Sequence, residues 1–299
     1  MKGLGALVKR NCKLFFRDKG MFFTSLITPL ILRVLYATFL EKVYRDAFSS
    51  ALPDGFSVKD ALINGTVGGQ LISSLLAVCC VTVAFCSNLL MVQDKISGAE
   101  RDLTMSPVKR STLALGYFAA SALSTLLICF VALAVCLFYL AVTGWYLSVT
   151  DVLLLILDVF LLVLFGTALS SLINCRLTTN GQASAVGTIV SAGYGFICGA
   201  YMPISSFGEG LQKVLSFLPG TYGTALIRNH ALGGVYAEME RVGFPAEVIE
   251  GIRDSIDCNL YFFGEKVTLG AMYGILGGAT AVLIGGYVLL NLLQKKRRR

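Results

Sequence analysis

Long apolar runs alternate with short charged segments along this chain. A helix needs about 20 apolar residues to cross the hydrocarbon core of a bilayer, and six runs approach or exceed that length. They cover residues 20–40, 67–92, 112–142, 152–174, 182–202 and 268–293. These runs lack the alternation of apolar and polar positions that marks barrel strands, so helices are expected. The pattern predicts an all-α polytopic membrane protein whose six spans form a single transmembrane domain over residues 1–299.

The first nineteen residues show a different pattern. At about 100° per residue, the apolar side chains gather on one face and the basic ones on the other. The apolar face includes Leu7 and Phe15, and the basic face includes Lys9, Arg10 and Lys13. This predicts a helix over residues 1–19 that lies in the membrane interface. The alternative is a basic flank without fixed structure.

Composition and charge place the chain in a membrane and orient it there. Of 299 residues, 56% are hydrophobic and 14% are charged, against about 25% charged in soluble domains. Lys and Arg cluster before residue 20, within 95–110 and after residue 294, whereas acidic residues outnumber basic ones over 205–266. Because basic residues favour the cytoplasmic side, we expect a multi-pass protein of the cell membrane with both termini cytoplasmic. The basic clusters beside the spans account for the net charge of +7, so no nucleic-acid partner is expected. Membrane lipids are the expected surroundings.

The sequence offers little for an enzyme or a metal site. It has no GxxxxGK[ST] phosphate-binding loop, and its only histidine, His230, argues against a His-rich metal site and a Ser-His-Asp triad. Most of the nine cysteines lie inside predicted spans, where they act as small apolar side chains. Cys258 is the one expected to be exposed. No cofactor, metal or catalytic residue is therefore predicted for this chain.

A charged segment, residues 93–111, separates the second and third spans. Ser97 and Glu100 have the spacing of a capping box, and Pro107 disfavours helical structure in the residue before it. A short helix over 97–105 is therefore predicted, with Leu103 and Met105 as its apolar contacts and with Arg101 and Asp102 facing the cytoplasm. The alternative is a solvated loop.

Two segments together resemble a known family. Gly98, Leu103 and Ser106-Pro107-Val108 directly follow the second span. Gly199-Ala-Tyr-Met-Pro203, followed by Leu218-Pro219-Gly220-Thr221-Tyr222, comes at the end of the fifth. In order and spacing they resemble the permease subunits of type-2 ABC exporters, and the resemblance covers nearly the whole chain. It departs from the family at Arg101, where many relatives have an acidic residue, and at Phe207, where a proline is common.

The resemblance implies a mechanism. Two permeases, either two copies of this chain or this chain and a paralogue, would pair, and each would dock a separate ATPase subunit through its coupling helix. ATP and Mg would be bound by that partner, which would drive an amphipathic drug, lipid or lipid-linked molecule outward. The contacts implied for the ATPase are Ser97, Gly98, Glu100, Arg101, Asp102, Leu103 and Met105.

The resemblance also implies where the substrate passes. The family lines its pathway mainly with the second and fifth spans, which makes Phe85, Asn88, Tyr194 and Phe196 candidate lining residues. Residues 203–266 would form outer re-entrant helices and a lid. Within them, Pro245 could start a helix whose apolar stripe includes Ile249 and Ile252; ordinary connecting structure is the alternative.

Two charged residues fall inside predicted spans. Arg33 lies near the outer end of the first span, and Asp158 lies at a comparable depth in the fourth. A charge in a span costs about 2.5–3.5 kcal/mol on insertion scales and usually finds a partner, so we predict that the two pair or share a water pocket. Separate snorkelling to the interface is the alternative.

Two other functions remain open from the sequence. An ion-gradient-driven secondary transporter would favour several carboxylates inside the membrane and matched halves, whereas Asp158 is the one clear mid-span carboxylate. A membrane scaffold without transport would leave the charged segment unexplained. Co-purification of an ATPase subunit would separate the exporter from both.

Overall fold

Helices make up almost all of the protein as the computed structural model describes it, over residues 3–42, 45, 60–106 and 108–297. The helices are α1 (Leu4–Arg17), α2 (Lys19–Leu35), the π-helical turn η1 (Tyr36–Leu40), α4 (Asp60–Ser97), α5 (Ala99–Met105), α6 (Arg110–Thr143), α7 (Val149–Asn174), α8 (Asn180–Ile197), the 3-10 turn η2 (Ile204–Ser206), α9 (Glu209–Leu215), α10 (Pro219–Val242), α11 (Ala246–Ser255) and α12 (Leu269–Arg297). Strands β1 (Tyr261–Phe262) and β2 (Glu265–Lys266) pair antiparallel.

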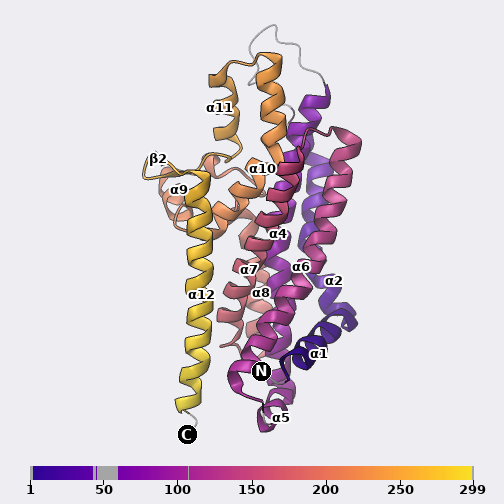
Figure 1. Ribbon diagram of the computed structural model, residues 1–299, viewed down its shortest axis with the longest axis vertical. Coiled ribbons are helices and arrows are strands. Elements are labelled where there is room, and N and C mark those ends of the chain that lie inside the picture. The colour runs from indigo at the N-terminus through magenta and orange to yellow at the C-terminus, as the bar shows by residue number, and fades with distance from the viewer. Residues whose placement is uncertain (1–2, 43–44, 46–59, 107, 298–299) are drawn as a thin grey trace.

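The central element is α4, which packs against α2, α6, α7, α8 and α10. It is apolar on all sides, and a helix of that kind is stable only when other helices surround it. Leu76, Val78 and Val81 are completely buried within it. By contrast, α12 stands at the edge of the bundle beside α7 and α10 and remains largely exposed (Figure 1).

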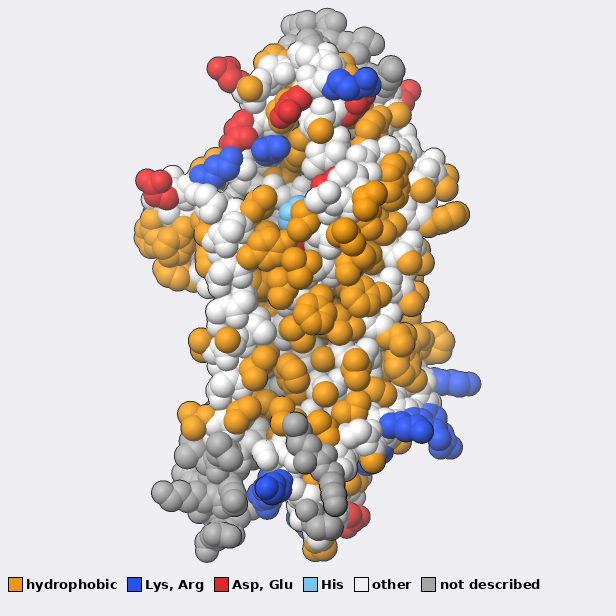
Figure 2. Space-filling view, in the orientation of Figure 1, with side chains coloured by type: hydrophobic (Ala, Val, Ile, Leu, Met, Phe, Trp, Pro, Cys, Tyr) orange, Lys and Arg blue, Asp and Glu red, His pale blue; other side chains and the backbone are white. Residues whose placement is uncertain are grey.

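The two ends of the bundle differ in chemistry. In Figure 1, α1, α5 and the C-terminal end of α12 lie together at one end, which we call the basic end. The far end of α10 and all of α11 form the opposite, distal end. Figure 2 shows acidic side chains gathered toward the distal end of the visible face, with a wide hydrophobic belt between the two ends. Such a belt is the surface expected of a protein surrounded by lipid.

Four helices of the described chain are long and apolar enough to cross a membrane: α4, α6, α7 and α12. They contain or largely coincide with the predicted runs 67–92, 112–142, 152–174 and 268–293. The predicted run 20–40 is helical through α2 and η1, and the run 182–202 is helical as far as Ile197. The count of six spans stays a prediction.

The segment before α12 contains a long helix that the periodicity did not indicate. In α10, Leu226 and Ile227 are buried in one hydrophobic cluster and Leu232 in another, so no single apolar stripe marks the helix. The helix predicted after Pro245 is present as α11, with Ile249 and Ile252 each 4% exposed.

The expectation that Cys258 is exposed is wrong. The side chain is buried beneath α11, and its Sγ lies 3.1 Å from Tyr236 Oη. The cause is tertiary: α11 folds back on α10 and covers the residue that follows it.

Candidate functional site

The short helix α5 lies at the basic end between α4 and α6. It covers Ala99–Met105, close to the predicted 97–105. Arg101 and Asp102 are exposed, Glu100 is half-buried, and the Met105 side chain is 84% exposed. Leu103 packs on the cluster that includes Leu7, Met91, Leu113, Tyr117 and Tyr287. The expectation that Met105 packs against the bundle as an apolar contact is therefore wrong, because of the two apolar side chains the helix turns Leu103 inward and Met105 outward.

The predicted capping box does not form. Gly98 adopts a left-handed backbone (φ 83°) and is itself the N-cap of α5, without a side-chain cap. Ser97 therefore remains the last residue of α4 and donates to the Asp94 carbonyl at 3.4 Å. Glycine takes this conformation at little cost, which lets the chain bend sharply between the two helices. Pro107 lies outside the described residues.

A charged cluster ties α1 to the base of α4. Arg10 donates from Nη1 and Nη2 to the two carboxylate oxygens of Asp94 at 2.7 and 3.1 Å. Tyr117 of α6 donates to the same carboxylate at 2.6 Å. The hydrogen bond to Asp94 is the main cause that raises the pKa of Arg10 above its ordinary value. Three helices are thus joined three residues before α4 ends.

The next residue, Lys95, ties the base of α4 to the end of α7. Its Nζ donates to the carbonyls of Asn174, Cys175 and Leu177 at 3.1, 2.7 and 3.2 Å. The last carbonyls of a helix lack partners within it, and a lysine there also favours the helix dipole. The end of α4, from which the chain continues into α5, is therefore bonded to α1, α6 and α7.

A groove runs along the bundle between α2, α4 and α8. It encloses about 820 Å³ and is largely apolar, with Ile31, Leu35, Leu89 and Val92 among its lining residues. On α8, the residues that line it lie three or four apart and so share one face. They form two adjacent rows with a spacing of four, Ala183, Gly187 and Ser191 in one and Ser184, Thr188, Ala192 and Phe196 in the other.

Of the four predicted lining residues, the structure places Phe196 in this groove and the others within the bundle. Phe85 is 2% and Tyr194 7% exposed. Asn88 is 1% exposed and donates to Ser170 and Ser171 of α7 at 3.0 and 2.7 Å. The helices α4 and α8 do meet at the groove, but α4 turns Cys86, Leu89 and Gln93 toward it.

The predicted pairing of Arg33 with Asp158 is wrong. One carboxylate oxygen of Asp158 lies 2.6 Å from His230 Nδ1 of α10, and the other accepts from Tyr273 of α12 at 2.5 Å. The Arg33 guanidinium lies instead over the ring of Tyr139, 5.2 Å from its centroid. Similar depth did not bring the two charges together, because α10 supplies a nearer partner for α7.

A buried ion pair lies in the distal half. Arg228 donates to the carbonyls of Ile256 and Gly199 at 2.7 and 2.9 Å, and its Nη1 lies 3.4 Å from the Asp257 carboxylate. Asp257 accepts from the backbone N–H groups of Ile204 and Ser205 at 2.6 and 3.1 Å. Burial raises the pKa of Asp257, although Arg228 opposes this. The two residues hold the stretch after α8 against α10.

The helical bundle and its hydrophobic belt define a multi-pass helical membrane protein. A comparison with protein families matches residues 2–231 to the ABC-2 type transporter family. The chain therefore belongs to the ABC-2 type transporter family, as a permease subunit. A comparison with curated proteins found no match.

The sequence did not predict the hydrogen bonds that Asp94 and Lys95 form near the end of α4. In the sequence, Asp94 and Lys95 are members of a charged segment, and Arg10 is part of a basic face; no local pattern links them. One signal was present: Tyr117 places a phenol in an otherwise apolar part of the third span, and a buried phenol usually has a hydrogen-bond partner.

Proposed function

We propose that this chain is the membrane subunit of an ATP-driven exporter that moves an amphipathic substrate outward across the cell membrane. In this proposal the chain crosses the membrane six times, with both termini cytoplasmic. Hydrolysis takes place on a separate ATPase subunit that binds ATP and Mg. This chain itself performs no catalysis.

The observation that carries the proposal is the exposed surface of α5. Arg101, Asp102 and Met105 point away from the bundle, while the end of α4 that precedes α5 is bonded to α1, α6 and α7 through Asp94 and Lys95. Because α5 is exposed and follows a helix end that is held by several hydrogen bonds, a force applied to it by a bound partner can be transmitted to the spans. We therefore assign the ATPase contact to this helix.

The groove between α2, α4 and α8 supports the second part of the proposal. It opens on the surface, it is largely apolar, and small residues such as Gly187 and Ser191 line it. Small residues let membrane helices approach closely. In the proposed assembly a second copy or a paralogous permease faces this groove, and an amphipathic substrate passes between the two subunits.

Retention of the ATPase by the purified permease tests the proposal. Reversing both charges (Arg101→Glu with Asp102→Arg), or replacing Met105 with Asp, should weaken ATPase binding by at least about tenfold, since interface anchors contribute about 2 kcal/mol or more. The control is Val149→Asp, because Val149 is 80% exposed at the start of α7, at the distal end. Unchanged ATPase binding in both test variants would refute the assignment.

The buried pair of Asp158 and His230, with the half-buried Tyr273 beside it, favours one other candidate, a transporter driven by a proton gradient. Titratable groups inside a membrane often relay protons. Transport by proteoliposomes separates the two candidates. The exporter requires ATP hydrolysis and works without a gradient, whereas the alternative works with an inactive ATPase and fails in Asp158→Asn.

A further inference from the structure

Three aromatic side chains form a projecting corner beside the distal end of α12. Phe217 follows α9, and Phe262 and Phe263 belong to the β1–β2 hairpin. Their ring centroids lie 4.9, 5.2 and 5.9 Å apart in T-shaped contacts. Such contacts stabilise the rings as one unit. We call these three residues the aromatic corner.

The corner is exposed even though it is large and apolar. Phe217 is 62%, Phe262 38% and Phe263 67% exposed. The hairpin turn has positive φ at both central residues, 49° at Phe263 and 90° at Gly264. A bulky residue rarely adopts that conformation, and a two-residue turn of this kind usually carries Asn or Asp at the first position. Here it carries a phenylalanine, whose ring lies at the tip.

The position of the corner along the bundle indicates what covers it. Strand β2 ends at Lys266, and α12 begins three residues later. The candidate span of α12 is 23 residues long, or about 35 Å at 1.5 Å per residue, against a hydrocarbon core of about 30 Å. The distal end of this span, and the hairpin beside it (Figure 1), therefore lie at the boundary between acyl chains and headgroups.

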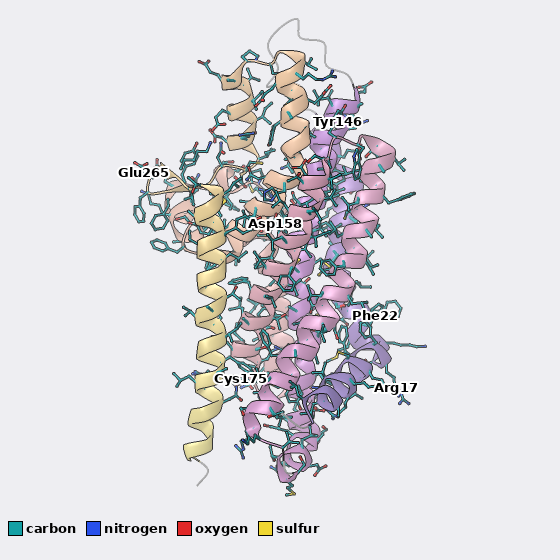
Figure 3. All side chains as sticks on the ribbon, in the orientation of Figure 1. Arg17, Phe22, Tyr146, Asp158, Cys175 and Glu265 are labelled. Atoms are coloured by element: carbon teal, nitrogen blue, oxygen red, sulfur yellow. The ribbon has the colours of Figure 1, made fainter. Side chains whose placement is uncertain are left out.

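The charged residues of the hairpin lie on its distal side, away from the hydrophobic belt. Lys266 forms an ion pair with Glu250 of α11, which lies on the distal side. Glu265 projects from the outer edge of the hairpin (Figure 3). Figure 2 shows an acidic side chain at this edge of the molecule, above a group of hydrophobic side chains that lies nearer the hydrophobic belt. The hairpin thus places charge toward water and aromatic rings toward the membrane.

We propose that the aromatic corner inserts into the lipid leaflet on the distal side, at the level of the headgroup–acyl boundary. Aromatic side chains are enriched at this depth. None of the three residues lines the groove between α2, α4 and α8, so the corner is separate from the face assigned to a second permease. Its insertion would fix the hairpin, α9 and the start of α12 relative to the bilayer.

Fluorescence quenching tests the proposal without ATPase or substrate. Trp145 is the only tryptophan, so Phe263→Trp in a Trp145→Phe background places one reporter at the hairpin tip of the full chain. In nanodiscs whose lipids carry bromine near the headgroup end of the acyl chains, this reporter should lose most of its emission. Aqueous iodide should quench it little. Phe217→Trp in the same background is a second reporter with the same expected result.

The matched control is Val242→Trp in that background, because Val242 is 47% exposed at the distal end of α10. Iodide should quench this reporter strongly, and brominated lipid should not. If the corner reporters behave like the control, the corner lies in water and the proposal is wrong. If neither quencher reaches them, protein covers the corner, and the proposal is equally wrong. Absence of ATP-driven transport by the unaltered protein, together with the expected quenching, would count against the exporter assignment alone.

Discussion

Replacing Asp94 with alanine removes the acceptor of three hydrogen bonds at the base of α4. Two come from Arg10 and one from Tyr117. The Asp94 side chain is 8% and that of Arg10 32% exposed. The Tyr117 hydroxyl would be left buried without this partner, at a cost of about 1–3 kcal/mol, whereas Arg10 could recover water. We expect Asp94→Ala to lower the free energy of unfolding by about 3 kcal/mol.

Arg10→Ala removes the donor of the same ion pair. It leaves a nearly buried carboxylate with only the Tyr117 hydroxyl, and hydrogen bonds to charged groups contribute about 1.5–3 kcal/mol each. Because both single variants break the same pair, the double variant should cost less than their sum. We expect a coupling energy of about 1.5–3 kcal/mol, within the range found for residues in contact.

Unfolding in mixed detergent–SDS micelles, followed by circular dichroism, gives the four free energies of this double-mutant cycle. The matched control is the pair Arg241–Glu238 in α10, where Nε and Nη2 each lie 2.7 Å from a carboxylate oxygen but the Arg241 side chain is 74% exposed. Exposed pairs of this kind contribute little, so its coupling should be clearly smaller. Additivity at Arg10 and Asp94 within about 0.5 kcal/mol, or coupling no larger than in the control, would refute the reasoning.

Two further predictions concern the distal half. Burial raises the pKa of the Cys258 thiol to about 11, so at pH 7–8 the thiol stays protonated and covered. Mass spectrometry after maleimide treatment should find Cys258 unmodified in the native protein and modified after unfolding in SDS; rapid native labelling would contradict this. In α10, a Cβ at Gly234 would lie 1.8 Å from the Tyr146 carbonyl oxygen. Gly234→Ala should therefore cost at least about 1–3 kcal/mol, whereas Gly251→Ala, with nothing within 4 Å, should be neutral or stabilising by up to about 1 kcal/mol. Equal thermal stability of these two variants would contradict the close approach of α10 to the α6–α7 connection.

The sequence by itself determined the features that depend on local pattern. Apolar length located the four helices that can cross a membrane, because each must present enough hydrocarbon to cross it. The short charged segment predicted α5 to within two residues, and Pro245 with its apolar stripe predicted α11. Hydropathy and helix periodicity reside in neighbouring residues, so no knowledge of packing was needed.

Tertiary structure decided which of these elements meet and which sides they present. Asp158 pairs with His230, 72 residues away, because α10 packs against α7, and no local pattern in either helix records that contact. The rotation of α4 turns Asn88 toward α7 and Cys86 toward the groove, a difference invisible in a helix that is apolar on all sides. The bond between Arg10 and Asp94 joins residues 84 apart. Depth and composition limit where such side chains can lie, but only the packing of helices against one another selects their partners.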